Sequence, residues 1–328
     1  MDGTHIKANA NIKKKMKKAI PSAAKAYEEQ LMKEINEDRR AHGKKPFDGN
    51  CGGGKPMERE VTVSTTDPES GMFRKGDHKH CFAYKVHTVC DRHNFILDTV
   101  VTSGKVHDSV AFDQLYEKVT GRFPEIQTAT MDAGYKTPWI CKYIIYNARI
   151  PSLPCKRPMT KKGFHEWYKY VYDEYLDIVI CPEYRRLLYS TTNWKGYREY
   201  KSLKYQCAAC GTRHLCTESR ECQKTVTRHI WEDYIEQAED MRHSAQGKES
   251  YRFRSQTIER VFADAKEKYG MRYTPYRGLK RVHMWVRLEY AAMNLKKLAM
   301  WKWKAVHRQF FVTISMAAFK KNLCCAAA

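Results

Sequence analysis

The stretch Cys81-Phe-Ala-Tyr-Lys-Val-His-Thr-Val-Cys90 decides the fold class, because apolar and polar residues alternate along it. An alternation of period two is typical of a β-strand with one face in the core. A second strand is predicted at 95–102, after a tight turn at 91–94, so the two strands form a hairpin. The residues that share one face of the first strand are Phe82, Tyr84, Val86, Thr88 and Cys90.

Strands and helices continue on each side of this hairpin. Residues 2–8 predict a strand, and 23–40 predict a helix because strong helix formers dominate that segment. Residues 107–109 precede a helix, and we expect Asp108 or Ser109 to be its N-cap. The elements expected next are a strand at 126–131 ending at Asp132, a helix from Thr137 with Pro138 in its first turn, and a strand at 150–153. This order predicts a mixed α/β fold.

Residues 156–225 interrupt this order with dense basic residues and cysteines, and Tyr168, Tyr170 and Tyr172 alternate along a predicted strand. Helical sequence returns at 232–269, and a last helix is predicted at 281–301. We therefore divide the chain into four parts. They are a first part of the core at 1–155 (with a helical and loop insertion at about 13–66), an insert at 156–225, a helical part at 226–302 and a tail at 303–328.

The charge of the chain indicates a polyanionic partner. The sequence holds 59 Lys and Arg against 37 Asp and Glu, which gives a formal net charge of +22. Such an excess favours nucleic acid as the partner, while a generic basic surface is the alternative. The sequence has no basic-then-apolar start and no apolar run near the roughly 20 residues that cross a bilayer. We therefore expect neither a secreted nor a membrane-spanning protein.

Three acidic residues stand where a catalytic metal site needs them. Asp2 lies on the first predicted strand, Asp132 ends a strand, and Glu259 lies on a helix. Carboxylates brought together at a sheet edge can hold two Mg²⁺ ions that activate a water or a 3′-hydroxyl for attack on a phosphodiester. Each residue taken alone has a simpler interpretation, because an Asp before Gly commonly forms a turn and a helical Glu is commonly solvated.

Several motifs together resemble the DDE transposases of bacterial insertion sequences, over about residues 2–298. The motifs are Asp2-Gly3-Thr4, Gly76-Asp77-His78-Lys79, Val106-His107-Asp108-Ser109, Met131-Asp132-Ala133-Gly134-Tyr135-Lys136, Thr257-Ile258-Glu259-Arg260-Val261-Phe262-Ala263-Asp264-Ala265-Lys266 and Gly270-Met271-Arg272. The resemblance implies an RNase-H-like mixed sheet flanked by helices. It also implies dependence on two Mg²⁺ ions, for which Mn²⁺ can substitute, and cleavage and joining of transposon DNA ends.

The resemblance also assigns roles to individual residues. Asp2, Asp132 and Glu259 fall where the family has its three catalytic, metal-binding carboxylates. Tyr251, Arg254 and Lys266 match the DNA-contacting residues around the family's glutamate, although Arg254 precedes Glu259 by five residues where four is commoner. The implied partners are transposon-end and target DNA, with a homodimer assembled on the DNA, and the implied location is the cytoplasm, at the bacterial nucleoid.

One departure from the family concerns the N-terminus. In relatives a helical DNA-recognition region precedes the first catalytic aspartate, which here is residue 2. We therefore expect a truncated chain that transposes poorly or not at all. Two alternatives stay open: a non-catalytic remnant that binds DNA through its basic surface, and a nuclease that cuts DNA without joining it.

A cysteine cluster in the insert predicts a structural zinc site. Cys207-Ala-Ala-Cys210 is followed by Cys216, and Cys181 lies upstream. Four thiolates can bind Zn²⁺ tetrahedrally and so stabilise an insert with little apolar core, which makes this a zinc-ribbon-like insert. His214 and Cys222 are the alternative fourth ligands, and reduced thiols without metal are the alternative interpretation.

Basic and aromatic residues alternate near the start of the insert. A DNA-facing surface is predicted there, since cations bind phosphate and rings stack on exposed bases. The alternative is that the tyrosines pack a strand and the cations are merely solvated. The residues concerned are Lys156, Arg157, Lys161, Lys162, Trp167, Tyr168 and Tyr170.

Overall fold

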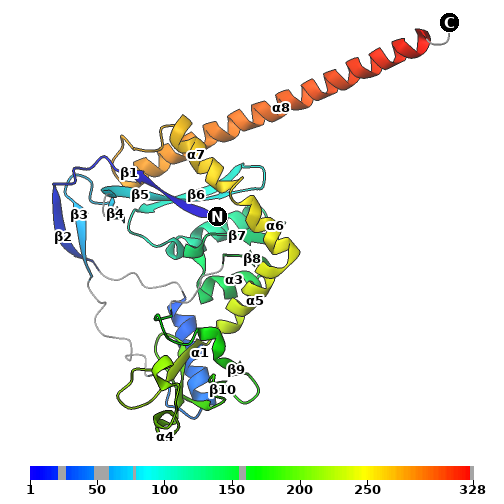
Figure 1. Ribbon diagram of the computed structural model, residues 1–328. Helices are drawn as coiled ribbons and strands as arrows, with labels where there is room; N and C mark the ends of the chain where they lie inside the picture. The colour runs from blue at the N-terminus through cyan, green and yellow to red at the C-terminus, as the bar shows by residue number, and fades with distance from the viewer. Residues whose placement is uncertain (21–26, 48–58, 77–78, 155–159, 326–328) are drawn as a thin grey trace. The chain divides into compact units, whose positions relative to one another are not determined.

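A computed structural model describes residues 1–20, 27–47, 59–76, 79–154 and 160–325. The chain forms two compact units. The first unit consists of Met1–Met16, Thr62–Pro124 and Arg252–Ala328, and the second consists of Lys17–Val61 and Glu125–Tyr251. Sheets and helices occur in both units (Figure 1), which confirms the mixed α/β class. Within the described residues, no helix combines the length and the apolar character needed to cross a bilayer.

The main sheet of the first unit is built on β5 (Lys79–Cys90), which pairs antiparallel with three other strands. β1 (Asp2–Lys7) runs along residues 83–88 of β5. On the other edge of β5 lie β4 (Gly71–Lys75) and β6 (Ile96–Ser103). The strand at the N-terminus and the hairpin at 81–102 are thus confirmed.

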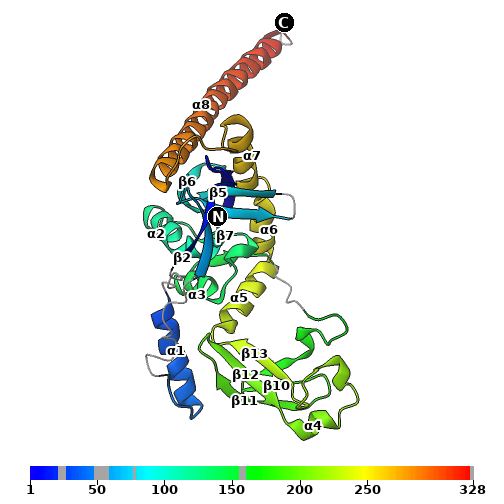
Figure 2. The same ribbon diagram turned by 90° about the vertical axis from the view of Figure 1, so that its left-hand side faces the viewer.

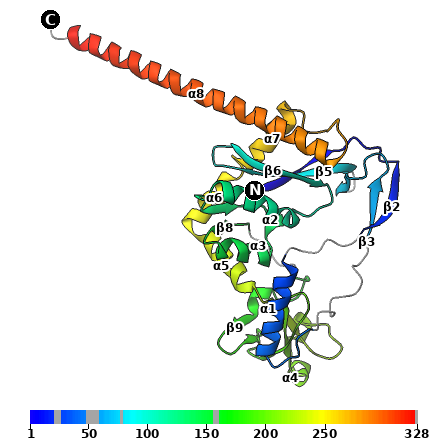
Figure 3. The ribbon, with the colours of Figure 1, turned by 180° about the vertical axis from the view of Figure 1, so that it is seen from behind.

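One face of β5 packs against two helices, as Figure 3 shows from behind. Phe82, Tyr84 and Val86 are fully buried, which confirms the face predicted by their alternation. The helices are α7 (Ile258–Lys268) and α8 (Leu279–Cys325), and α8 continues well past the predicted end at 301. The buried residues that these helices contribute to the core are Val261, Ala265, Val282, Val286 and Tyr290.

A buried polar cluster holds the start of α8 to the sheet. The Tyr84 hydroxyl donates to Asp67 Oδ1 at 2.7 Å and accepts from the Gly278 backbone N–H at 3.1 Å. Glu69 Oε2 accepts from the backbone N–H of Leu279 at 2.9 Å, so a carboxylate lies at the positive end of the helix. Burial raises the pKa of Asp67.

The helix after the hairpin begins as predicted but with a different cap. A short 3₁₀ turn, η1 (Asp108–Val110), leads into α2 (Phe112–Arg122). The cap acceptor is the side chain of His107, which accepts from the Ser109 backbone N–H. The expectation of an Asp108 or Ser109 N-cap is therefore wrong, because the Asp108 carboxylate is engaged with β5 instead.

The second unit contains a parallel pair of strands, β7 (Thr128–Thr130) and β8 (Ile150–Ser152). α3 (Pro138–Tyr146) lies between them in sequence and packs with α5 (Glu232–His243). Thr137 caps α3 by accepting from the Ile140 backbone N–H, with Pro138 in the first turn as predicted. A further helix, α1 (Glu28–Ala41), contributes the buried residues Leu31 and Ile35.

A five-stranded antiparallel sheet occupies the predicted insert and extends past its end at 225 (Figure 2). Its strands are β9 (Val171–Asp173), β10 (Ile178–Ile180), β11 (Arg186–Thr192), β12 (Tyr197–Ser202) and β13 (Thr225–His229). Tyr168 lies in a 3₁₀ turn, η3 (Trp167–Lys169), and so is not on the strand predicted for it. Short turns of helix follow β12, namely α4 (Lys204–Ala208) and η4 (Arg213–Leu215).

Two remaining features complete the element order. β2 (Lys15–Ile20) and β3 (Arg59–Ser64) form a two-stranded sheet. The helical sequence at 232–269 is divided into α5, α6 (Ala245–Phe253) and α7, with a turn at 254–257 between the last two.

Removal of the Tyr84 hydroxyl tests how much the buried polar cluster at the start of α8 stabilises the fold. Tyr84→Phe removes one of the two donors to Asp67 Oδ1, the other being the Gly278 N–H at 3.2 Å, and leaves that N–H with one acceptor instead of two. We therefore expect the free energy of unfolding to fall by ~1–3 kcal/mol in urea titrations. Tyr175→Phe is the matched control, because Tyr175 is 95% exposed. Equal stability of the two variants would show that the cluster does not anchor the helix.

Candidate active site

Asp2 begins β1 at the edge of the main sheet of the first unit. It pairs with Thr88 of β5, and only 12% of its side chain is exposed. The backbone N–H of Gly3 donates to Asp2 Oδ1 at 2.7 Å. The strand pairing and this bond hold the carboxylate in a fixed direction.

Glu259 lies in the first turn of α7, and 53% of its side chain is exposed. The opposite side of α7 is anchored in the core by Ile258, Val261, Phe262 and Ala265, which are all buried. Anchoring on one side leaves the glutamate directed away from the core. A negative charge in the first turn is also favoured by the helix dipole.

Arg254 connects the two carboxylates. Its Nη2 lies 2.5 Å from Asp2 Oδ2, and its Nη1 lies 3.3 Å from Glu259 Oε1. The residue belongs to the turn between α6 and α7, which explains why five residues separate it from Glu259. The extra residue is accommodated in this turn, and the guanidinium still reaches the glutamate. Asp2, Arg254 and Glu259 are thus brought together within the first unit.

A second ionic cluster lies against the other face of β1. Lys85 Nζ donates to Asp108 Oδ2 at 2.7 Å, and His87 Nδ1 lies 3.2 Å from Asp108 Oδ1. Burial alone would raise the pKa of Asp108, but the bonds from His87 and Lys85 outweigh it and lower the pKa to about 2. This contribution to stability is present above the unfolded-state pKa of about 3.9 and is lost as the pH falls toward 2.

Sequence reasoning did not identify this cluster, although β5 contains a signal for it. Lys85 and His87 alternate with the apolar face, so both lie on the other face of the strand. Two basic residues there indicate an acidic partner. A Cβ on Gly3 would lie 2.5 Å from Asp108 Oδ1 and 2.9 Å from Lys85 Cε, so the ionic cluster requires glycine after Asp2.

Asp132 belongs to the second unit and directly follows the buried Met131, two residues after β7. A 3₁₀ turn, η2 (Ala133–Tyr135), begins immediately after it, and Tyr135 is buried. The predicted position at the end of a strand is therefore confirmed. The next basic residue, Lys136, forms an ion pair with Glu239 of α5.

Two further predicted DNA contacts lie near Glu259 in the sequence. Lys266 is on α7, two turns after Glu259, and is half-buried. Tyr251 is on α6 and is also half-buried.

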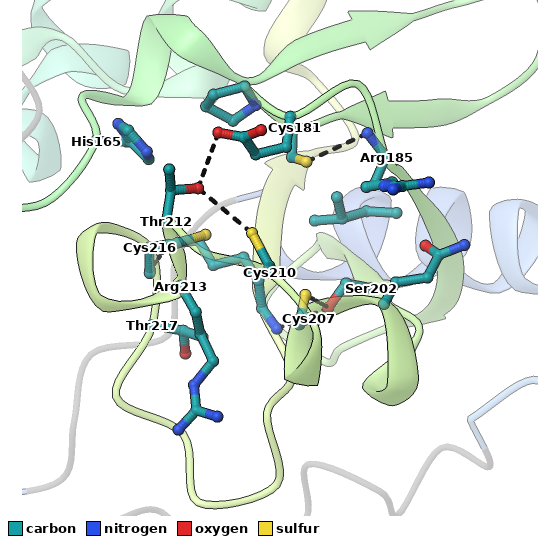
Figure 4. Close-up of a pocket in the computed structure, with 15 residues that line it drawn as sticks. His165, Cys181, Arg185, Ser202, Cys207, Cys210, Thr212, Arg213, Cys216 and Thr217 are labelled. Atoms are coloured by element: carbon teal, nitrogen blue, oxygen red, sulfur yellow. Dashed lines mark hydrogen bonds between the residues drawn. The ribbon is translucent and has the colours of Figure 1, made fainter.

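The four predicted zinc ligands line one small pocket in the insert, with a cavity volume of about 20 Å³ (Figure 4). His165 also lines this pocket, whereas the alternative ligands His214 and Cys222 are not among its lining residues. The sulfur contacts are Cys181 with the Arg185 backbone N–H at 3.3 Å, Cys207 with Ser202 at 3.1 Å, Cys210 with Thr212 at 3.3 Å and Cys216 with Tyr170 at 2.9 Å.

The pocket does not have the geometry of a formed metal site. Among the described residues, no group of three or more His, Cys, Asp or Glu side chains is placed to hold a metal ion. Burial raises the pKa of the Cys216 thiol. The zinc-ribbon-like insert is therefore not confirmed, although the four cysteines do lie around one cavity.

The predicted DNA-facing residues of the insert differ in their environments. Trp167 and Tyr168 are 57% and 63% exposed, as a stacking surface requires. Tyr170 instead turns toward the cysteine pocket, where burial and the bond with Cys216 raise its pKa. Lys161 forms an exposed ion pair with Glu218 at 2.5 Å, and Lys162 is exposed. Lys156 and Arg157 lie outside the described residues.

Comparison with protein-family models gave a match over part of the chain. Residues 180–299 match a family model described as "Transposase DDE domain". The match begins in the insert, includes all four pocket cysteines and Glu259, and ends within α8. It supports a DDE-type transposase. Comparisons with curated proteins and with solved structures each gave no match.

A substitution at Gly3 tests whether the side chains of Asp108 and Lys85 pack closely against the start of β1. We expect Gly3→Ala to lower the free energy of unfolding by ~1–3 kcal/mol, because the added methyl group meets a carboxylate held by two partners. Gly121→Ala in α2 is the control, since a Cβ there meets nothing within 4 Å and the change should stabilise by ~0.4–1 kcal/mol. Urea unfolding that gives the same sign for both variants would contradict this packing.

Proposed function

We propose that this protein is a DNA transposase that catalyses metal-dependent cleavage and strand transfer of insertion-sequence DNA. The observation that carries the proposal is the convergence of Asp2 and Glu259 on Arg254. Glu259 and Arg254 both lie within the segment matched to the transposase DDE domain. An RNase-H-like core agrees with the first unit, in which an aspartate begins the first strand of an antiparallel sheet and a helix carries the glutamate.

The carboxylates fit divalent cations by their chemistry. Asp2 and Glu259 supply the oxygen ligands that Mg²⁺ and Mn²⁺ prefer, and a guanidinium cation already lies between them. Asp132 supplies the third carboxylate of the proposed set. When bound, two such ions activate the attacking hydroxyl and stabilise the charge that develops on the leaving oxygen.

The remaining residues of the proposed site bind and orient the DNA. Arg254 and Lys266 supply positive charge beside Glu259 for phosphate groups near the cleaved bond, with Tyr251 as a neighbouring contact. Lys156, Arg157, Lys161, Lys162 and the exposed rings Trp167 and Tyr168 are the DNA contacts that we propose for the insert. Two chains assemble on the DNA ends in this proposal, which light scattering of the protein–DNA complex checks.

Nicking of supercoiled DNA tests the catalytic proposal. We expect Mg²⁺-dependent nicking that falls by roughly two orders of magnitude or more in Asp132→Asn and in Glu259→Gln, because each change removes a metal-ligating charge. Glu267→Gln is the matched control, since Glu267 lies on the same helix, is 60% exposed and forms an ion pair with Arg272. This control should nick at the parental rate.

The same assay distinguishes the alternatives. Binding of DNA without any nicking, unaffected by the carboxylate changes, would support a non-catalytic remnant. Nicking without joining of a cognate end would support a nuclease. Cleavage and joining that survive Asp132→Asn would contradict the proposed ligand set.

We also propose that the cysteine pocket binds a structural zinc ion. The support is the common pocket that Cys181, Cys207, Cys210 and Cys216 line. Thiolates are the preferred ligands of structural zinc, and binding would release the thiol protons and close the pocket around the ion.

Metal analysis of protein purified without chelator tests this second proposal. We expect about one zinc ion per chain, and a loss of that zinc in Cys207→Ser. Cys222→Ser should keep the metal, because Cys222 does not line the pocket. A zinc-free protein whose melting temperature does not rise when zinc is added would refute the site.

A further inference from the structure

Arg254 occupies the place between two carboxylates that a metal ion also needs. Its guanidinium contacts Asp2 at 2.5 Å and Glu259 at 3.3 Å. We propose that Arg254 is a built-in counter-ion that competes with divalent cations for these carboxylates and leaves them when metal binds. The inference rests on the proposed function and adds a control of metal binding at the same site.

The competition follows from the contacts of Asp2. Its Oδ2 is engaged by Arg254, and its Oδ1 accepts from the Gly3 backbone N–H, so both oxygens already have donors. A metal ion that binds Oδ2 lies close to the guanidinium, and the repulsion between the two cations favours displacement of the guanidinium.

Burial makes this competition strong. The side chains of Asp2 and Arg254 are only 12% and 14% exposed, so solvent screens their attraction weakly. Glu259 is 53% exposed and holds the guanidinium more loosely, from the solvent side. Displacement therefore requires breaking the Asp2–Arg254 pair.

The backbone around Arg254 permits this movement. The residue lies in the turn at 254–257, between the end of α6 and the start of α7. α7 itself is fixed by its buried face, so the arginine side chain can rotate outward while Glu259 stays in place. A displaced Arg254 is then available to a DNA phosphate, which makes metal binding and DNA binding mutually reinforcing.

Titration with Mn²⁺, followed by the electron paramagnetic resonance of the free ion, tests the inference on the full chain. We expect Arg254→Gln to bind Mn²⁺ about tenfold or more tightly than the parent, because the competing charge is removed. Arg252→Gln is the matched control, since it removes the same charge from an exposed side chain two residues away. Its affinity should match that of the parent.

A double variant and a nuclear magnetic resonance titration locate the bound ion. Asp2→Asn added to Arg254→Gln should abolish the gain, which locates the ion at this site. In the parent protein, Mg²⁺ should shift the Arg254 side-chain signal in a ¹⁵N nuclear magnetic resonance spectrum. This measurement does not depend on whether a variant folds. Equal Mn²⁺ affinity of parent and Arg254→Gln, or an unmoved signal at saturating Mg²⁺, would overturn the counter-ion. Absence of Mn²⁺ binding in both proteins would instead overturn the proposed metal site.

Discussion

The pairing of three strands with β5 is the constraint on which the first unit depends. β1, β4 and β6 all hydrogen-bond to this strand, so its register determines where Asp2 lies. One face of β5 packs against α7 and thereby places Glu259, while the other face holds the ionic cluster of Lys85, His87 and Asp108. A shift of one residue would exchange these two faces and separate the carboxylates.

Sequence patterns predicted most of the helices and strands, because these patterns reflect interactions between residues that are close in sequence. The alternation of β5, the capping Thr137 and the apolar face of α7 each involve neighbours in sequence, and the structure contains all three. The errors concern distant partners. Asp108 looked like a helix cap, but an ion pair with Lys85 stabilises it more. Tyr170 was predicted on a strand, but it lies just before β9 and bonds to Cys216, which is 46 residues away.

The candidate site was predictable in its composition and less so in its arrangement. The spacing of Arg254, Glu259 and Lys266 indicated which residues belong to the candidate site. The turn between α6 and α7 explains why five residues separate Arg254 from Glu259. Spacing could not show that the guanidinium would lie between the carboxylates, because that contact joins residues 252 positions apart. The net charge of +22 likewise indicated a polyanionic partner. It could not show that the Arg254 guanidinium pairs with the carboxylates of Asp2 and Glu259.

The first unit is assembled from three separate segments of the chain, so parts that pair with each other are synthesised at different times. Lys7 of β1 exchanges backbone hydrogen bonds with Arg272 and Thr274, at 3.1 and 3.0 Å. The ribosome therefore releases the first strand long before its last neighbours exist. The sheet of the insert, by contrast, joins strands that are close in sequence and can form as it emerges. The first unit therefore cannot be completed until its last segment, from residue 252 on, has been synthesised.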